Sequence, residues 1–360
     1  MIRMIAALIG AAVLLGIAAA VFLSRPAFGR LPRGARLARI ERSPNYRDGS
    51  FRNRLPTPLF TSERGRLGTM LAMLLGKPPR VRPDGPLPVV KSDLRGLNPA
   101  QDLVVWFGHS SYLLQAGGRR ILVDPVFCCA APVSFVNRPF AGTDAWTPDD
   151  MPAVDCLLIT HDHWDHLDYR TVMRLKGRTA RVVCPLGVGE HFEYWGFDPA
   201  RIVELDWDES ALLEAGLTIH CLPSRHFSGR GPVPNRTLWA SYLLETPAGK
   251  IYVGGDGGYD GRFARIGTRF GGVDLAVLEN GQYDEAWRYI HMMPRYLLRA
   301  VRELGAARVL TVHHSKYALA RHPWDEPLEN ARRAAQSGVA EVIVPTIGEL
   351  VPLRDSAPRP

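Results

Sequence analysis

From about residue 100 onward, apolar and polar positions alternate in short blocks. Runs rich in valine, isoleucine and leucine between glycine, proline and polar residues are typical of β-strands, whereas apolar residues three or four apart are typical of helices. We expect strands at residues 103–107, 111–114, 120–123, 154–159, 180–183, 217–221, 238–244, 250–253, 275–278, 309–312 and 341–344. We expect helices at residues 169–175, 187–194, 261–269, 294–304 and 327–336. Because strands dominate and helices follow polar clusters, the pattern favours two packed sheets with helices outside and ligand-binding loops at one edge.

The first residues break this pattern, because they form one unbroken apolar stretch. Residues 5–23 read IAALIGAAVLLGIAAAVFL, nineteen residues without a charge or a proline. A helix of that length spans about 28 Å, which is close to the hydrocarbon thickness of a bilayer. We therefore expect residues 1–24 to form a transmembrane anchor. A signal segment cleaved near residues 18–20 is the alternative, because the alanines there suit a cleavage site.

The net charge of +8 is confined to the segment that follows this stretch. Residues 25–66 contain eleven arginines and three acidic residues, so they carry the whole excess and the rest of the chain is balanced. A balanced body argues against nucleic-acid binding. Arginines beside an apolar helix instead indicate a membrane surface, and the positive-inside rule favours a cytoplasmic body. Export to the periplasm after signal cleavage is the alternative.

Residues 25–100 form a juxtamembrane extension rich in arginine and proline, and a regularly structured body is expected from residue 101 to 355. One apolar island, LGTMLAMLL at residues 67–75, interrupts the extension and predicts a short helix. Such a helix either packs against the body or faces the membrane. The chain therefore divides into an anchor, an extension and one body that is long enough to bury a large core.

A dense polar cluster, THDHWDH at residues 160–166, directly follows the predicted strand at 154–159. Buried charge is costly when it is unpaired, and a divalent cation is one partner that holds several imidazoles and carboxylates together. Both groups suit zinc. In a turn after a strand, His161 and His163 can face one ion. Asp165 and His166 can face a second, so the cluster predicts part of a dinuclear metal site.

One loop cannot supply all the ligands of two ions, and further candidates follow downstream strands. His226, Asp256 and His313 each come shortly after a predicted strand, and Asp256 lies within the sequence GGDGG. Each of them alone is compatible with a structural role, but together they stand where ligands on loops are expected. We predict His161, His163 and His226 on one ion, Asp165, His166 and His313 on the other, and Asp256 as a bridge between both.

This set of residues resembles the metallo-β-lactamase superfamily, and its surroundings are similar to N-acyl-phosphatidylethanolamine-hydrolysing phospholipase D and its bacterial relatives. The similar segments are WFGHSSYLL (106–114), ILVDPVF (121–127), THDHWDHLDY (160–169), CPLGV (184–188), VELDWDE (203–209), GGDGGY (254–259), RYIHMMP (288–294) and HHSKYALARHPWDEP (313–327). The likeness keeps its order from about residue 51 to 352. It implies an α/β (α+β) fold, a four-layer αββα sandwich, for the hydrolase domain at 101–355. It also implies two Zn²⁺ per chain at the predicted ligand positions and hydrolysis of a phosphodiester.

The resemblance also suggests roles for residues outside the ligand set. His291 is a candidate general acid or phosphate clamp, with an exposed loop histidine as the alternative. Asp124 is expected to support a ligand histidine from behind, unless it only forms an Asp-Pro turn. His109 would orient water or substrate, or else be a core histidine. The eukaryotic enzyme has tyrosine where this chain has Trp164, and we expect this difference to alter the pocket wall.

Two zinc ions that share a water would lower its pKa toward about 7 and supply a hydroxide for attack on phosphorus. Asp165 and Asp256 would act in catalysis by holding the metal pair, and His291 would protonate the leaving group. The expected substrate is a phospholipid or another small phosphodiester at a membrane surface. A homodimer is compatible with the sequence.

Other functions on the same ligand pattern remain open. A lactonase or another carboxylic ester or amide hydrolase would use the same site, because hydroxide attacks either kind of centre. An oxygen-reducing di-iron protein of this fold would carry glutamate in place of His163. A nuclease would show a basic body. A non-catalytic metal-binding scaffold would have lost ligands, and none is lost here. The apolar N-terminus and its arginines favour the lipid phosphodiester.

Overall fold

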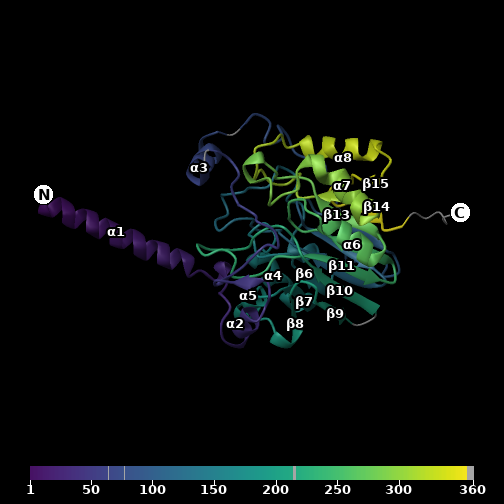
Figure 1. Ribbon diagram of the computed structural model, residues 1–360, viewed down its shortest axis with the longest axis horizontal. Helices are drawn as coiled ribbons and strands as arrows, with labels where there is room; N and C mark the ends of the chain where they lie inside the picture. Colours follow the sequence, from purple (N-terminus) through teal and green to yellow (C-terminus); the bar gives the residue numbers. More distant parts are fainter. Residues whose placement is uncertain (64, 77, 214–215, 355–360) are drawn as a thin grey trace.

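The computed structural model describes residues 1–63, 65–76, 78–213 and 216–354. Within these residues two seven-stranded sheets pack against each other, and helices cover their outer faces (Figure 1). The expected four-layer αββα sandwich is confirmed. Its main apolar core includes buried residues from both sheets, among them Leu113, Leu157 and Tyr242. Burial of apolar side chains between two sheets is the main force that stabilises this architecture.

The first sheet has the strand order β16-β3-β4-β5-β6-β7-β8. Its strands are β3 (Leu103–Trp106), β4 (Tyr112–Ala116), β5 (Arg119–Val123), β6 (Val154–Leu158), β7 (Thr179–Pro185), β8 (Ile202–Leu205) and β16 (Leu350–Pro352). Strands β4 and β5 pair antiparallel across the predicted turn at Gly117 and Gly118, whereas β5, β6, β7 and β8 pair parallel. Helix α4 (Tyr169–Leu175) joins β6 to β7, and helix α5 (Gly189–Tyr194) joins β7 to β8.

The second sheet has the order β15-β14-β13-β12-β11-β10-β9 and repeats this plan. Its strands are β9 (Ser210–Leu213), β10 (Leu217–Leu222), β11 (Ser241–Thr246), β12 (Gly249–Val253), β13 (Val273–Glu279), β14 (Ala306–Val312) and β15 (Glu341–Ile343). Strands β12 to β15 pair parallel and are joined by helices α6 (Arg262–Phe270), α7 (Pro294–Leu304) and α8 (Glu326–Gln336). A second apolar cluster, which includes Phe263 and Leu297, packs α6 and α7 against the outer face of this sheet.

The parallel halves of the two sheets determine where the functional loops lie. Asp124 follows β5 and the cluster at 160–166 follows β6, while Asp256 and His313 follow β12 and β14. Loops at the carboxyl ends of parallel strands lie together at one edge of a sheet, where ligands of open α/β sheets bind. The candidate residues of both sheets therefore converge.

The structure adds elements that the hydrophobic pattern does not predict. Strands β8, β9 and β16 lie at sheet edges, and β9 alternates exposed with half-buried side chains. The two-residue strands β1 (Tyr46–Arg47) and β2 (Ser50–Phe51) form a small hairpin in the extension. The strand expected from residue 238 begins at Ser241. Short edge strands bury little apolar surface, so their signal in the sequence is weak.

The N-terminal apolar stretch forms helix α1 (Ile2–Leu23), which projects away from the body with its apolar window fully exposed (Figure 1). By length and composition it could cross a membrane, and a signal sequence would pass the same test. The apolar island forms helix α3 (Gly65–Leu75), which lies on the same side of the body as α1. Its Leu67, Leu71 and Leu75 are exposed, whereas Thr69 is buried. Helix α3 therefore presents an apolar stripe at its surface.

The arginine-rich extension packs on the body through both apolar and ionic contacts. Helix α2 (Gly34–Glu41) places Ile40 in the main core. Arg36 pairs with the buried carboxylate of Glu190 at 2.5 Å. Acidic residues of the body also pair with Arg30, Arg39 and Arg54. These arginines therefore have protein partners and do not need anionic lipid head groups to balance their charge. Fewer arginines of the segment are then left to bind a membrane surface than its charge alone suggested.

Candidate metal centre

The cluster at residues 160–166 forms a tight loop that starts just after β6. The backbone N–H groups of His166 and Leu167 both donate to the carbonyl of His163, at 3.1 and 2.8 Å, and fold the loop back on itself. The N–H of Ala240 donates to the carbonyl of Thr160 at 2.9 Å and ties the loop to the segment that precedes β11. The loop is therefore held between the two sheets, where ligands from both can meet.

Three histidines form the first half of the site. Nδ1 of His163 lies 2.9 Å from Nε2 of His161 and 3.2 Å from Nε2 of His226. The other ring nitrogen of His161 contacts the hydroxyl of Thr160 at 3.0 Å, and that of His226 donates to the carbonyl of Ile290 at 2.7 Å. With Nδ1 engaged in this way, Nε2 of His161 and of His226 carries a lone pair, which is the form that binds a metal.

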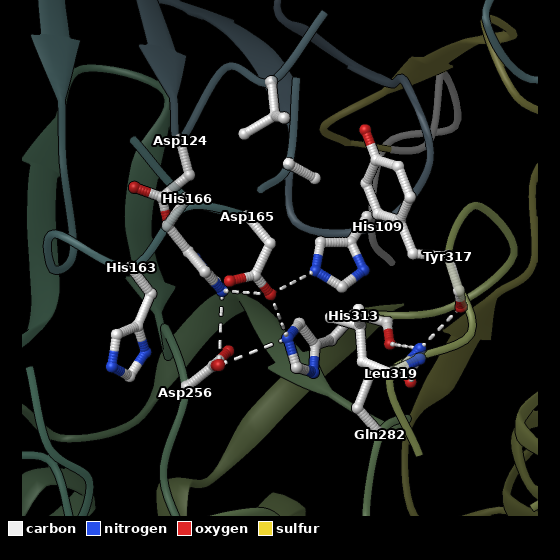
Figure 2. Close-up of polar contacts among 12 residues, drawn as sticks. His109, Asp124, His163, Asp165, His166, Asp256, Gln282, His313, Tyr317 and Leu319 are labelled. Carbon is white, nitrogen blue, oxygen red and sulfur yellow. Dashed lines mark hydrogen bonds and ion pairs between the residues drawn. The ribbon is translucent and has the colours of Figure 1, made fainter. Parts of the chain in front are cut away.

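The second half of the site comes from Asp165, His166 and His313 (Figure 2). Oδ2 of Asp165 lies 3.7 Å from Nε2 of His166 and 3.5 Å from Nε2 of His313. Asp256 stands between the two halves. Its Oδ2 is 3.2 Å from Nε2 of both His166 and His313, and 3.7 Å from Nε2 of His226. The structure thus brings together all seven side chains predicted as ligands, with Asp256 at the centre.

Several polar atoms of this group are buried without a hydrogen-bond partner among the described residues. They are Nε2 of His166, Nε2 of His313 and Oδ1 of Asp256. A buried polar atom without a partner is costly, so these atoms require a group that accepts lone pairs from nitrogen and oxygen together. A divalent cation does this, and imidazole with carboxylate is a donor set that suits zinc. The residues present therefore fit the expected metal ions.

Glycines bring the Asp256 loop close to its neighbours. Gly255 has a φ of 57°, in the left-handed region. A Cβ at Gly257 would overlap the hydroxyl of Ser224, and a Cβ at Gly258 would overlap the carbonyl of Tyr289. Only glycine allows the backbone to pass at this distance, so the GGDGG sequence holds Asp256 between the two sets of histidines.

Asp124 lies behind His166, on the side away from the other ligands. Its carboxylate accepts hydrogen bonds from Nδ1 of His166 at 2.8 Å, from the N–H of Thr160 at 2.8 Å and from the Thr160 hydroxyl at 2.6 Å. This contact fixes the tautomer and the ring orientation of His166. Nε2 of His166 then faces Asp256, as Figure 2 shows.

His109 and Glu279 hold other members of the site. His109 is fully buried, and its Nε2 donates to Oδ2 of Asp165 at 2.9 Å, so it contacts a candidate ligand and not the cavity. Glu279 is not predicted from the sequence. Its carboxylate accepts from Nδ1 of His291 at 2.8 Å and from the N–H groups of Gly257 and Met292, both at 2.7 Å. One feature of the sequence could have identified Glu279 as a site residue. It is a polar residue at the end of an apolar strand, because it is the last residue of β13.

The buried groups differ in how they bind protons. Burial, reinforced by neighbouring imidazoles, lowers the pKa of His161 well below its ordinary value, so this ring is neutral. Burial would raise the pKa of Asp256, but the imidazoles of His166 and His313 outweigh it and hold that pKa well below its usual range. In these two histidines the carboxylates outweigh burial and raise the pKa. A metal bound there would therefore displace protons.

These side chains open onto a cavity of about 540 Å³. Its polar lining consists mainly of His163, Asp165, His226, Asp256, His291 and His313. Its apolar lining includes Leu59, Phe60, Phe227, Trp287, Ile290 and Leu319. Leu59 and Phe60 belong to the extension, for which the sequence indicated no part in the site. A few convergent polar groups in a largely apolar cavity suit a substrate whose reactive polar group is attached to hydrocarbon.

His291 lines this cavity, whereas Trp164 does not. Nδ1 of His291 lies 3.9 Å from Oδ2 of Asp256 and is bonded to Glu279, so Nε2 is the nitrogen left for a ligand. The ring of Trp164 instead meets Phe28 edge-on, with 5.0 Å between centroids. The expectation that Trp164 forms the pocket wall is wrong, because this side chain packs against the segment that follows α1.

Replacing Asp124 with asparagine is expected to weaken metal binding about 10- to 100-fold, the usual cost of losing a carboxylate behind a ligand histidine. An amide cannot accept from both His166 and Thr160 without turning its own NH₂ toward a donor. Metal affinity would be measured by competition with a chromophoric chelator. Asp155→Asn is the matched control, because Asp155 lies in the adjacent strand β6 and pairs with Arg119. Unchanged affinity in Asp124→Asn would leave Asp124 with a turn-forming role only.

Comparisons with known proteins agree with this geometry. The family profile described as "Beta-lactamase superfamily domain" matches residues 119–314. The chain belongs to the metallo-β-lactamase superfamily. An uncharacterised protein of Mycobacterium tuberculosis is 41% identical to this superfamily member, over 86% of this chain and 85% of that protein.

Two further proteins resemble this metallo-β-lactamase-fold chain, one in sequence and one in fold. A Saccharomyces cerevisiae protein named "N-acyl-phosphatidylethanolamine-hydrolyzing phospholipase D, mitochondrial" is 31% identical over 65% of this chain and 52% of that protein. The solved structure of Igni18, a metallo hydrolase from Ignicoccus hospitalis, matches the fold with a TM-score of 0.54 at 23% identity, over 70% of this chain and 98% of that one. The chain is a metal-dependent hydrolase of the metallo-β-lactamase fold, with a His/Asp cluster that could hold metal.

Proposed function

We propose that this chain hydrolyses a phosphodiester bond in a membrane phospholipid, with two zinc ions in the site. The main support is one combination of features. Seven candidate ligands, arranged in two halves of one site, lie at a largely apolar cavity. The first helix of the same chain could enter a bilayer. The name of the yeast relative points to the same substrate class for that protein. The balanced charge of the body gives no support to a nucleic-acid substrate.

The geometry supports the following ligand roles. His161, His163 and His226 would hold one ion, Asp165, His166 and His313 would hold the other, and Asp256 would be shared. The ions would supply a nucleophile from water at neutral pH and offset the charge that develops on the phosphoryl oxygens. Asp124 and His109 keep His166 and Asp165 oriented, and the apolar walls hold the hydrocarbon of the substrate and exclude bulk water.

His291 is placed to move a proton at the leaving oxygen. Its Nδ1 donates to the Glu279 carboxylate at 2.8 Å, and this hydrogen bond fixes the orientation of the ring. Nε2 can then donate its proton to the alcohol that departs when the P–O bond breaks. The side chain is only 13% exposed and lies at the cavity, where a leaving group would be found.

The membrane part of the proposal rests on two helices. Helix α1 is the candidate anchor, and the exposed Leu67, Leu71 and Leu75 of α3 lie on the same side of the body. An amphipathic helix next to a membrane span can lie in the interface with its apolar face toward the lipid. We place the body on the cytoplasmic side with α1 uncleaved. Cleavage of α1 and export to the periplasm is the alternative.

The proposal is tested with the full-length chain purified in detergent, after its metal content has been measured by elemental analysis. Three substrates are compared, namely N-acyl-phosphatidylethanolamine in mixed micelles, bis(p-nitrophenyl) phosphate and an acyl lactone. About two zinc ions per chain with turnover of the lipid and the model phosphodiester would support the proposal. Turnover of the lactone alone would move the substrate to the carboxylic ester class. A folded, metal-binding chain without any turnover would favour a scaffold role.

His291→Ala is expected to lower kcat on the lipid about 100-fold or more, the usual contribution of a general acid. The loss on bis(p-nitrophenyl) phosphate should be much smaller, because p-nitrophenolate leaves as a stable anion and needs no proton. His220→Ala is the matched control, since His220 lies on β10 and pairs with Glu245. Equal losses on both substrates would assign His291 to phosphate binding and not to proton transfer.

A further inference from the structure

The residues that directly follow helix α1 pack against the back of the candidate metal loop. They form a short 3-10 helix, Pro26–Phe28, whose Phe28 ring meets Trp164 edge-on. The indole N–H of Trp195 donates to the carbonyl of Pro26 at 2.8 Å. Trp164 lies between the candidate ligands of the loop and does not line the cavity, so the segment after α1 contacts the loop through a side chain outside the cavity.

Arg230 connects this segment with the metal loop at two places, Asp162 and Leu167. Its Nε and Nη2 donate to the carbonyl of Ala27 at 3.0 and 2.8 Å. Its Nη1 donates to the carbonyls of Asp162 and Leu167 at 2.9 and 2.6 Å. The guanidinium carbon also lies 4.0 Å from the centroid of the Trp164 ring, and the residue is buried. One rigid guanidinium thus joins residue 27 to the metal loop through four hydrogen bonds and one stacking contact.

His191 supplies a second, independent link. The N–H of Arg30 donates to Nδ1 of His191 at 3.1 Å, and Nε2 of His191 donates to Oδ2 of Asp162 at 3.1 Å. Asp162 is buried, and it also accepts from the hydroxyl of Thr237 at 2.8 Å. Gly29 makes this arrangement fit, because it has a φ of 72° and a Cβ there would overlap the His191 ring. The backbone at residues 29 and 30 is therefore built against His191.

Successive side chains of the loop face different partners. His161 and His163 point to the candidate metal site, whereas Asp162 points to His191, which contacts Arg30, and Trp164 points to Phe28. Neighbouring residues of the loop thus share one short stretch of backbone. A shift of residues 26–30 would move Asp162 and Trp164, and it would move the two histidines with them.

We propose that the segment Pro26–Arg30 positions the metal loop, and that Arg230 and His191 are the positioning residues that transmit its placement. The segment continues α1, so the orientation of the candidate anchor and the geometry of the site are coupled. This inference rests on the metal site of the proposed function. We therefore expect substitutions at residues 26–30 to weaken metal binding although they change no candidate ligand.

The test compares Gly29→Ala with Gly34→Ala in the full-length chain. Both glycines have positive φ values, 72° and 56°, so both substitutions strain the backbone, but a Cβ at Gly34 meets no atom within 4 Å. Two readouts are taken on metal-free protein, the deuterium uptake of peptides covering residues 160–167 and the affinity for zinc. Gly29→Ala should raise the uptake of these peptides and weaken zinc binding about 10-fold or more. Gly34→Ala should leave both unchanged.

A second variant keeps the test decisive if Gly29→Ala does not fold. Arg230→Lys retains the positive charge, but an ammonium cannot donate to the carbonyls of Ala27, Asp162 and Leu167 in one fixed plane. It should raise the uptake at residues 160–167 and lower zinc affinity. Arg308→Lys is its control, because Arg308 is also buried and donates to the carbonyl of Pro352.

Unchanged uptake and zinc affinity in both Gly29→Ala and Arg230→Lys would overturn the inference. Failure of the proposed function is distinguishable from this outcome. A wild-type chain that binds zinc but hydrolyses no phosphodiester would contradict the proposed function. The deuterium-uptake and zinc-affinity measurements would still show whether residues 26–30 position the loop.

Discussion

Replacing Asp256 with asparagine should lower turnover at least about 100-fold, the scale seen when a group that stabilises transition-state charge is removed. Asp256 faces both halves of the site, because its Oδ2 lies 3.7 Å from Nε2 of His226 in the first half and 3.2 Å from Nε2 of His166 and of His313 in the second. Asparagine has nearly the same size but no charge. The two buried imidazoles would then lose the carboxylate that balances their charge, and the two proposed cations would lose their shared ligand.

The fold should survive this change, because the glycine-rich loop and both sheets are untouched. The measurements are kcat, metal content by elemental analysis and thermal unfolding of the same preparation. Asp274→Asn is the matched control. Asp274 lies at the N-terminal end of β13, whereas the site lies at the carboxyl end of the strands. Its carboxylate accepts from the N–H of Lys250 at 2.8 Å, which an amide oxygen can also do. Wild-type turnover and metal content in Asp256→Asn would contradict the assignment of the whole site.

Removing the metal should abolish hydrolysis and also destabilise the protein. Without a cation, three ring nitrogens of His161, His163 and His226 face one another within 4.8 Å, and Nε2 of His166 and of His313 has no hydrogen-bond partner in the part of the chain that the structure describes. An ion present at about 1,000 times its dissociation constant adds roughly 4 kcal/mol to the free energy of unfolding. For a domain of this size that corresponds to a change in Tm on the order of 10 °C.

The experiment treats the full-length chain with a chelator, confirms the loss of metal by elemental analysis, and records activity and Tm before and after zinc or magnesium is added back. Zinc should restore both, because imidazole ligands favour it. Magnesium should not, because it prefers oxygen ligands and keeps its waters. A metal-free protein with unchanged turnover and Tm would show that the His/Asp cluster is not a metal centre.

The site residues that could be predicted share one property, their place in the chain relative to strands. Asp124, Asp256 and His313 each follow an apolar run at the carboxyl end of a strand that lies in the parallel half of its sheet. The same rule would have found Glu279, which ends β13, but a lone glutamate between a leucine and an asparagine has no chemical partner in the local sequence. Its role depends on His291, twelve residues away across a loop.

Other contacts left no local signal. Residues 27, 164 and 230 meet at one guanidinium, although they are distant in the chain and none belongs to a periodic pattern. Trp164 was expected to alter the pocket wall because the eukaryotic enzyme has tyrosine at this position. In the turn that brings His161 and His163 to one side, Trp164 packs on the other side against Phe28. The direction of a side chain in a loop is decided by hydrogen bonds and packing from distant segments.

By itself, the pattern of the sequence determined two packed sheets with helices outside and the positions at which polar side chains leave the sheets, because strand periodicity and apolar runs are local properties that burial enforces. The tertiary structure decided which nitrogen of each histidine faces the centre, which carboxylates hold those rings, and how the segment after α1 supports the metal loop. These features arise from contacts between residues far apart in the chain. Their free energy depends on close packing and on hydrogen bonds formed only when both sheets are assembled.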